Sequence, residues 1–309
     1  MSSLKQKIQK SIRSHTLPTD MFGYGLIKLG FADKYLSGLV TMYHSYHWLA
    51  KKFGTLADDL AKADREETDA TKGECTPSRR VWVCWLQGID KAPKIVRDCF
   101  ASIQCWLSDW DITVITADNY AQYADIPNYI VDKWRQGTIC DAHFSDILRL
   151  SLLVRHGGLW LDATTFLSGP LPEYILNSAF FVYRNGWLDN EMINMGNWLI
   201  WSQRSDSILL RQTLKLLLAY WQEFDYPKNY FVLHMFFRMV TDRNREQWDR
   251  VPYVNQVDNH LLQWELERPF DSVRVKTITD QTSVHKLTYK LESGLASECT
   301  CFHLQELMK

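Results

Sequence analysis

Residues 143–166 read HFSDILRLSLLVRHGGLWLDATTF. The run is almost entirely apolar, yet it carries Asp146 near its start and Asp162 near its end. Aspartate is rarely buried without a partner or a metal ion, because taking a bare carboxylate out of water is costly. The spacing predicts a helix over residues 142–156, a Gly157–Gly158 stop, and a buried strand that ends at Asp162. Two acidic residues in one hydrophobic neighbourhood indicate a site.

Strands and helices alternate on the N-terminal side of this run. The segment VWVCWLQG, residues 81–88, suits a buried strand, APKIVRDCFASIQCWL has helical spacing, and DITVITADNY predicts a second strand. This order predicts an α/β fold with a mostly parallel, Rossmann-like sheet. Ligands of such sheets bind beyond the carboxyl ends of the strands. The residues that fall at this edge are Gln87, Gly88, Asp118, Asn119 and Asp162.

The composition changes abruptly before the first predicted strand. Residues 21–53 are rich in aromatic side chains and predict helix, whereas residues 57–80 are dominated by charged residues, Thr, Gly and Pro. We therefore expect a helical N-terminal segment over residues 1–75 and an α/β domain over residues 76–309. The C-terminal half of that domain is rich in predicted helices.

Bulk composition excludes several classes of protein. The formal net charge is −1, which argues against a nucleic-acid partner. Seven cysteines without a CxxC pair indicate free thiols in a reducing compartment. No signal peptide or membrane span is expected, and the motifs of dehydrogenases, P-loop NTPases, serine hydrolases and zinc proteases are missing. We expect a soluble, cytoplasmic protein.

The N-terminal 15 residues carry four basic side chains, with Leu4, Ile8 and Ile12 spaced four apart. This pattern predicts a basic amphipathic helix that could touch an anionic membrane surface. The alternative is a narrow apolar stripe that packs on its own domain. Residues 1–53 are thus the candidate for peripheral contact with the inner face of the plasma membrane.

The two aspartates have both functional and structural interpretations. Asp162, at the end of a strand, could hold a divalent cation that bridges two phosphate oxygens, or cap the next turn. Asp146 has Arg149 one turn later, which could be a plain ion pair. Alternatively, Ser145 and Asp146 face a ligand hydroxyl while Arg149 faces a phosphate.

Two dipeptides later in the chain offer further candidates. His285 could complete a metal site and Lys286 could neutralise a diphosphate, although such a pair is more often an ordinary loop. Asn197 could hydrogen-bond to a sugar on which Trp198 stacks. The alternative for Trp198 is a place in a core helix.

The stretch FSDILRLSLLVRHGGLWLDAT resembles the signature of bacterial capsular polysaccharide synthesis proteins, which are similar to the DXD-containing glycosyltransferases of family 32. Further matching stretches are VWVCWLQGIDKAPKIVRDC, DNYAQYADIPNYIVDKWRQG and VHKLTYK, so the resemblance runs from about Val81 to Lys290. The positions that match the signature are Ser145, Asp146, Arg149, Gly157, Gly158 and Asp162.

The resemblance implies a GT-A glycosyltransferase domain that binds a UDP- or GDP-sugar with Mn²⁺ or Mg²⁺. It would transfer the sugar, with retention, to a glycan or lipid-linked oligosaccharide acceptor of a capsular or other surface polysaccharide. The catalytic residues would be Asp162, Asp146 and Asn197, the metal ligands Asp162, Thr164 and His285, and the acceptor platform Trp198. Donor contacts would come from Gln87, Gly88, Asp118, Asn119, Ser145, Asp146, Arg149, Gly158 and Lys286.

The sequence departs from the wider pattern at Thr164, which occupies the second acidic position of the DXD motif. A threonine hydroxyl cannot supply a second anionic ligand, which puts tight metal binding in doubt. Thr164 and the aromatic N-terminus also suit a non-catalytic subunit that binds a glycan or a partner protein. A third interpretation is a hydrolase that uses Asp146 and Asp162 as acid and base. Its test is the distance between the two carboxylates, which must suit glycoside hydrolysis.

Overall fold

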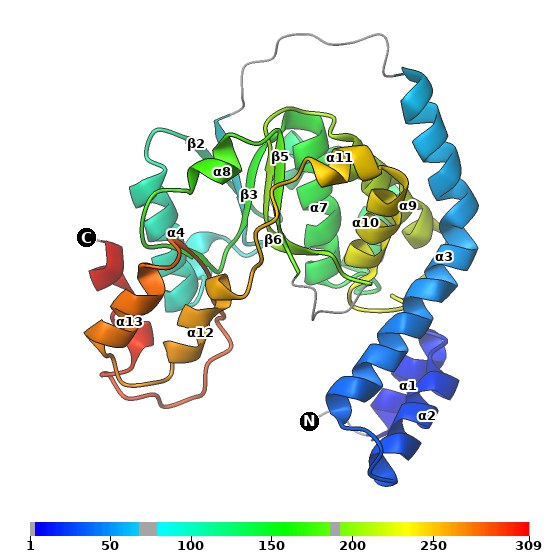
Figure 1. The fold of residues 1–309 in the computed structure, drawn as a ribbon, viewed down its shortest axis with the longest axis horizontal. Helices are drawn as coiled ribbons and strands as arrows, with labels where there is room; N and C mark the ends of the chain where they lie inside the picture. Colours follow the sequence, from blue (N-terminus) through cyan, green and yellow to red (C-terminus); the bar gives the residue numbers. More distant parts are fainter. Residues whose placement is uncertain (1–3, 68–78, 186–191, 309) are drawn as a thin grey trace.

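The computed structural model describes residues 4–67, 79–185 and 192–308, and a five-stranded mixed sheet lies at its centre (Figure 1). The strand order is β2-β1-β3-β6-β5. Strand β1 pairs in parallel with β2 and β3, whereas β6 is antiparallel to both β3 and β5. The bounds are β1 Arg80–Cys84, β2 Asp111–Ile115, β3 Gly158–Asp162, β5 Phe180–Arg184 and β6 Met195–Ser202.

The predicted parallel, Rossmann-like core is confirmed for β2, β1 and β3, and the arrangement is consistent with a GT-A-like fold. The core helix considered for MGNWLIWS is wrong, because this segment forms the antiparallel strand β6. A short apolar run of eight residues has no periodicity that separates a buried helix from a buried strand.

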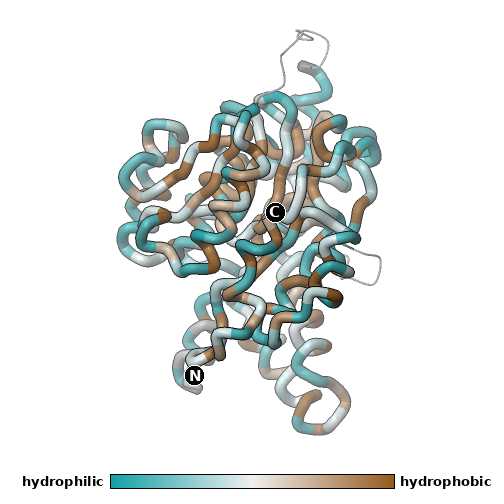
Figure 2. The backbone as a smooth tube through the Cα atoms, turned by 90° about the vertical axis from the view of Figure 1, so that its left-hand side faces the viewer, coloured by the Kyte–Doolittle hydropathy of each residue, from teal (hydrophilic) through white to brown (hydrophobic). Residues whose placement is uncertain are grey.

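Both faces of the sheet are buried under helices, which explains why its strands read as nearly continuous apolar runs. Trp82 and Trp160 point to one face, and Val81, Val83 and Leu161 point to the other. The first face packs on α7 (Asp141–His156), α9 (Ile208–Glu223) and α10 (Val232–Arg243), and the second on α4 (Lys94–Trp106). Figure 2 shows the most hydrophobic segments running through the interior of the main body.

Shorter elements complete the main body. A second sheet pairs β4 (Thr165–Leu167) with β7 (Val284–Lys286) in antiparallel register. The remaining helices are α5 Tyr120–Tyr123, α6 Asn128–Arg135, α8 Glu173–Leu176, α11 Arg245–Asp249, α12 Leu261–Glu265 and α13 Ser272–Thr279. The six cysteines in the described ranges are free thiols, as predicted.

Within the described residues before β1, the chain forms three helices: α1 (Leu4–Arg13), α2 (Leu17–Lys28) and α3 (Lys34–Glu67). The second half of α3 is not a separate segment, because Leu49, Phe53 and Ala57 are buried in the same core as α9 and α10. The predicted boundary at residue 75 lies outside the described residues. Figure 1 shows α1, α2 and the first half of α3 projecting from the main body. None of the helices in the described ranges is long and apolar enough to cross a membrane.

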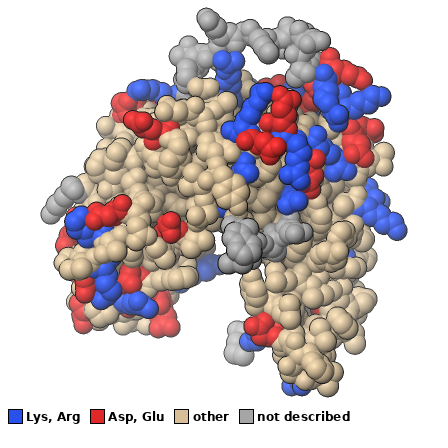
Figure 3. All heavy atoms as spheres, viewed as in Figure 1, with Lys and Arg blue, Asp and Glu red and all other residues tan. Residues whose placement is uncertain are grey.

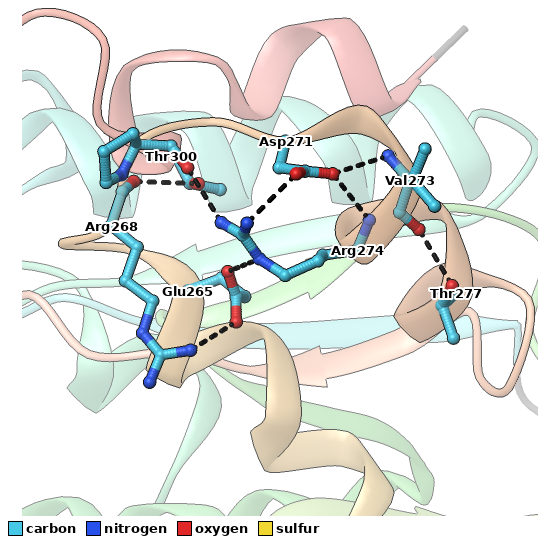
Figure 4. A network of polar contacts seen from close by, with 8 residues as sticks. Glu265, Arg268, Asp271, Val273, Arg274, Thr277 and Thr300 are labelled. Carbon is cyan, nitrogen blue, oxygen red and sulfur yellow. Dashed lines mark hydrogen bonds and ion pairs between the residues drawn. The ribbon is translucent and has the colours of Figure 1, made fainter.

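A polar network ties the C-terminal helices together (Figure 4). The buried carboxylate of Glu265 accepts hydrogen bonds from Arg268 at 3.1 Å and Arg274 at 3.0 Å. Asp271 caps α13 by accepting hydrogen bonds from the backbone N–H groups of Val273 and Arg274. Since α12 packs against both α13 and β7, this network supports the strand that carries Lys286.

Candidate functional site

Helix α7 and strand β3 bring the two aspartates to one place. Gly157 and Gly158 turn the chain directly from the end of α7 into β3, so the first half of α7 lies beside the carboxyl end of β3. Arg149 joins the two acids: its Nη2 lies 3.5 Å from Asp146 Oδ1 and 3.4 Å from Asp162 Oδ1. The paired acids predicted from the sequence therefore share one buried arginine.

Arg149 is held rigidly, and only 5% of it is exposed. Its Nη1 donates a hydrogen bond of 2.8 Å to the carbonyl oxygen of Asn197, and Nη2 donates one of 3.4 Å to Ser145 Oγ. Its guanidinium also lies 5.0 Å from the ring centroid of Trp160. Because the guanidinium is held by contacts on several sides, its N–H donors keep one fixed orientation in the site.

Asn197 reaches the site because β6 is antiparallel to β3. Its residue lies near the amino end of β6, which meets the carboxyl end of β3 at the same edge of the sheet. Asn197 Nδ2 donates a hydrogen bond of 3.1 Å to Asp146 Oδ1. Asp146 is thereby fixed by neighbours on two elements, α7 and β6.

Lys286 enters from the C-terminal part of the chain. Pairing of β7 with β4 places it opposite Thr165, and its Nζ donates hydrogen bonds to Asp162 Oδ2 at 3.0 Å and Thr164 Oγ1 at 2.5 Å. Burial alone would raise the pKa of Asp162, but the charges of Lys286 and Arg149 outweigh it and hold that pKa below its ordinary value. Asp162 is therefore an anion at neutral pH.

Protein cations and N–H donors surround the carboxylate of Asp162. Lys286 bonds to both Asp162 and Thr164, the two side chains predicted to hold the metal, and Trp160 Nε1 donates to the other carboxylate oxygen at 3.0 Å. In the described part of the chain, no group of three or more His, Cys, Asp or Glu side chains could hold a metal ion. An ammonium group thus contacts both side chains of the β3–β4 segment that the sequence predicted as metal ligands.

A cavity of about 290 Å³ opens onto this cluster, near the lower end of the range for small-molecule sites. Seven of the predicted residues line it: Ser145, Asp146, Arg149, Asp162, Thr164, Asn197 and Lys286. Sequence reasoning missed other lining residues, namely Cys84, Trp85, Trp160, Tyr230, His234 and Tyr289. One signal was available, since His234 is a polar residue in the apolar run NYFVLHMFFRMV. Burial lowers the pKa of His234 to about 4, so its imidazole is neutral there at pH 7.

The structure does not bring His285 to this cluster. The residue is fully buried on the opposite face of β7 from Lys286, and its Nε2 forms a hydrogen bond of 2.8 Å with Ser168 Oγ. Adjacent residues of a strand point to opposite faces, so His285 and Lys286 cannot both face the cavity. The metal-ligand role predicted for His285 conflicts with this placement.

Two more predicted contacts lie elsewhere. Trp198 is 4% exposed, stacks on Tyr183 and donates a hydrogen bond of 2.9 Å to Gln256 Oε1, so no acceptor sugar can stack on it. Gly158 begins β3 at the opposite end from Asp162 and does not line the cavity. Its role is structural, because a Cβ there would lie 2.5 Å from the carbonyl oxygen of Arg80.

Four predicted donor contacts lie at the expected edge of the sheet but do not line the cavity. Gln87 Nε2 donates to Asp141 Oδ2 at 3.4 Å, and Gly88 starts a 3₁₀ turn with φ of 84°. The amide of Asn119 is used within its own turn, where it bonds to the backbone of Val114 and Thr116. Asp118, next to it, is exposed to solvent.

The buried His285 predicts a pH dependence of stability. Burial lowers its pKa to about 4, whereas an unfolded histidine titrates near 6.5. Between these values the unfolded chain binds the extra proton, so stability falls as pH drops, by about 2 kcal/mol at pH 5. We expect His285→Gln to flatten the fall in unfolding free energy between pH 7 and pH 5, measured by urea denaturation. An unchanged slope would contradict the assignment of His285 as a buried neutral group.

Comparison with known proteins adds an independent finding. The family model described as "Capsular polysaccharide synthesis protein" matches residues 34–303, which include α3 and every residue of the cluster. The chain is also similar to O-glycosyltransferase braB from Annulohypoxylon truncatum, with 29% identity over 122 residues. That match covers 36% of this chain and spans only 29% of the relative's own length.

Two solved structures align with the chain at low identity and low TM-score. The PaToxG glycosyltransferase aligns over 86% of this chain and 96% of its own, with 13% identity and a TM-score of 0.40. A transferase double mutant aligns over 57% of this chain and 91% of its own, with 13% identity and a TM-score of 0.34. The resemblance predicted from residues 144–164 is confirmed by the family model.

Proposed function

Because the chain belongs to the capsular polysaccharide synthesis protein family, we propose that it is a glycosyltransferase acting in the assembly of a surface polysaccharide. It would move a sugar from a UDP- or GDP-sugar donor to a glycan or lipid-linked oligosaccharide acceptor. The observation that carries the proposal is the convergence of Arg149 and Lys286 on Asp162 in a cavity at the edge of the sheet. The name of the O-glycosyltransferase relative supports the same class of reaction.

The charges of the site suit the departure of a nucleoside diphosphate. When the bond between the anomeric carbon and the diphosphate breaks, the electron pair and the negative charge pass to a phosphate oxygen. Lys286 and Arg149 are the cations beside the cavity that would stabilise that charge. Because Arg149 is already fixed by Asn197, Ser145 and the two acids, it would need little reorganisation during the reaction.

Asp146 and Asn197 would orient the donor sugar. Asp146 lies on the cavity wall with one oxygen bonded to Asn197, which leaves Oδ2 as its acceptor for a sugar hydroxyl. His143 Nδ1 lies 3.6 Å from that Oδ2. Retention of configuration at the anomeric carbon stays a prediction from the resemblance to family 32.

Lys286 would take the place of the divalent cation that the resemblance implies. Its ammonium bonds to both predicted metal ligands, and Mg²⁺ or Mn²⁺ would have to displace it from Asp162 and Thr164. We therefore expect donor turnover in the presence of EDTA. A strict requirement for Mn²⁺ or Mg²⁺ would contradict this role of Lys286.

The two other interpretations of the sequence make different predictions. A hydrolase needs one carboxyl group that is protonated near its working pH, and the lowered pKa of Asp162 makes it a poor general acid. A non-catalytic subunit would bind a glycan or a partner without turning over a nucleotide-sugar.

Release of nucleoside diphosphate tests the proposal. Purified full-length protein should release UDP or GDP from one class of nucleotide-sugar through many turnovers, and faster with an oligosaccharide acceptor. Asp146→Ala and Asp162→Ala should both lower that rate. Binding of glycan with no turnover of any donor would favour the non-catalytic subunit.

A peripheral membrane contact is a further part of the proposal. The projecting end of α2 and α3 exposes a cluster of large apolar side chains, and Figure 3 shows few charged atoms there. Residues 1–53 contain eight Lys or Arg and two Asp or Glu, whereas the whole chain has a formal net charge of −1. The exposed side chains are Met21, Phe22, Leu29, Phe31, Tyr35 and Leu36, between 44% and 74% exposed. Apolar anchors beside basic residues suit an anionic bilayer surface.

Flotation with vesicles tests this contact. The protein should float with phosphatidylserine-containing vesicles at low salt and less at high salt, because ions screen the attraction. Leu29→Ser with Phe31→Ser should weaken flotation, whereas the matched control Val273→Ser should not, although Val273 is 74% exposed. Equal flotation of the two variants would place the membrane contact elsewhere.

A further inference from the structure

We propose that the acceptor lies in a groove between the N-terminal helices and the main body, as an extended oligosaccharide of several sugars. This inference rests on the proposed function. The groove takes the acceptor-binding role that the sequence predicted for Trp198, which is buried. The groove contains a cavity of about 650 Å³ with walls from two sides. Ser11, Asp20 and Thr41 come from α1, α2 and α3, while residues 137–140 and 226–230 of the main body face them.

The groove extends beyond this cavity. A neighbouring cavity of about 510 Å³ reaches past Arg13 and His15 to Trp48 and Glu223. The two hollows share five lining residues: Ser14, Gly137, Thr138, Tyr226 and Lys228. Together they form one adjoining pair of hollows, which has more room than a single monosaccharide needs and suits a chain of sugars.

The groove meets the donor cavity at Tyr230. This residue lines both hollows, and 61% of it is exposed. His143 also lines the groove, 3.6 Å from the carboxylate of Asp146. An acceptor in the groove would therefore present its end to the side of the donor cavity where Asp146 lies.

The chemistry of the walls suits a carbohydrate. Tyr230 offers an exposed ring face, with the ring of His143 5.6 Å away, and aromatic faces pack well on the apolar face of a sugar. Thr138 and Asn229 add hydroxyl and amide groups.

The Asp and Lys side chains that line the larger cavity are already paired with the protein. Lys228 Nζ donates to the carbonyl oxygen of His15 at 2.7 Å, and Asp20 accepts hydrogen bonds from Thr16 and Thr41 at 2.7 and 3.0 Å. Burial lowers the pKa of Lys228, which disfavours its charged form. These contacts favour a ligand recognised through rings and hydroxyl groups over a polyanion such as nucleic acid.

Cys140 gives a test that separates the acceptor from the donor. Its side chain is exposed and lines the groove but not the donor cavity, so Cys140→Trp should obstruct the groove without altering donor contacts. The matched control is Cys105→Trp, at an exposed cysteine on α4 whose Sγ contacts the carbonyl oxygen of Met308. The acceptor probe is a set of oligosaccharides released by mild acid from the surface polysaccharide of the source cells.

Cys140→Trp should raise the acceptor KM at least tenfold while the donor Kd, measured by calorimetry, stays within twofold of wild type. Cys105→Trp should change neither. In the wild type, the oligosaccharides should slow labelling of Cys140 by N-ethylmaleimide and leave labelling of Cys105 unchanged. Equal acceptor KM values for the two variants, with unprotected Cys140, would overturn the groove assignment while leaving the donor site intact. If the wild type itself binds no nucleotide-sugar donor, that result would instead overturn the proposed function, and this inference with it.

Discussion

Replacing Lys286 by methionine is expected to lower the rate of donor turnover about 100- to 1,000-fold, the usual effect of removing one group that stabilises developing charge. Lys286 is the cation bonded to both Asp162 and Thr164, and it lines the donor cavity. Without Lys286, two negative charges would lie close together, one on the departing diphosphate and one on Asp162. Only the positive charge of Arg149 would then offset them. Methionine keeps most of the length of the side chain and removes the charge.

The measurement is nucleoside diphosphate release at saturating donor, in EDTA, with Lys290→Met as the matched control. Lys290 lies four residues further along the chain, is exposed and does not line the donor cavity. The control should retain the wild-type rate. If Lys286→Met were as active as Lys290→Met, the site would not use Lys286 as its cation.

Replacing Gly158 by alanine is expected to destabilise the fold by about 4 kcal/mol or more, a loss that only a few structural mechanisms produce. Gly158 has a φ of 96°, and a Cβ there would lie 2.5 Å from the carbonyl oxygen of Arg80. That oxygen belongs to β1, which is paired on both sides and cannot move away cheaply. The substitution would therefore push apart β1 and β3, the two strands whose carboxyl ends form the site.

Urea denaturation with Gly294→Ala as control separates backbone strain from the clash. Gly294 has a φ of 80° with no atom within 4 Å of a built Cβ, so alanine there should cost only about 1–2 kcal/mol. Similar losses for the two variants would show that the close approach of β3 to β1 is relaxed in solution.

The stretch 143–166 predicted much of the site because its signals are local. The signals for a long apolar helix, a two-glycine stop and a short strand follow one another directly in the sequence. Parallel pairing of β1 and β3 then determines which edge carries Asp162. The spacing of Asp146 and Arg149 places them on one face of α7, where the structure finds them paired.

The errors at Trp198 and His285 come from pairs of neighbours in strands. In Asn197–Trp198 and His285–Lys286, one residue faces the cavity and its neighbour faces the core behind it. Sequence identifies the pair as unusual, but it does not reveal which face of the pleat is buried until the pairing register is known. For β6, the segment was not even predicted as a strand.

Other residues depend on packing between distant segments. Tyr230 and His234 reach the cavity because α10 and the turn before it pack over the sheet, more than 60 residues after Asp162. The groove likewise depends on α1–α3 lying against residues 137–140 and 226–230. Periodicity in one segment predicts that a helix has an apolar face, but not which distant element that face meets.

Titration calorimetry with UDP-, GDP- and CMP-sugars, in EDTA and in Mn²⁺, tests most directly that the cluster of Arg149, Asp162 and Lys286 is a nucleotide-sugar site. The wild type should bind one class of nucleotide saturably in both buffers, and Lys286→Met should lose most of that affinity. If none of these donors binds, the result would contradict the assignment of the cluster as a nucleotide-sugar site. Binding that is unaffected by Lys286→Met and requires Mn²⁺ would contradict the assignment of Lys286 as its cation.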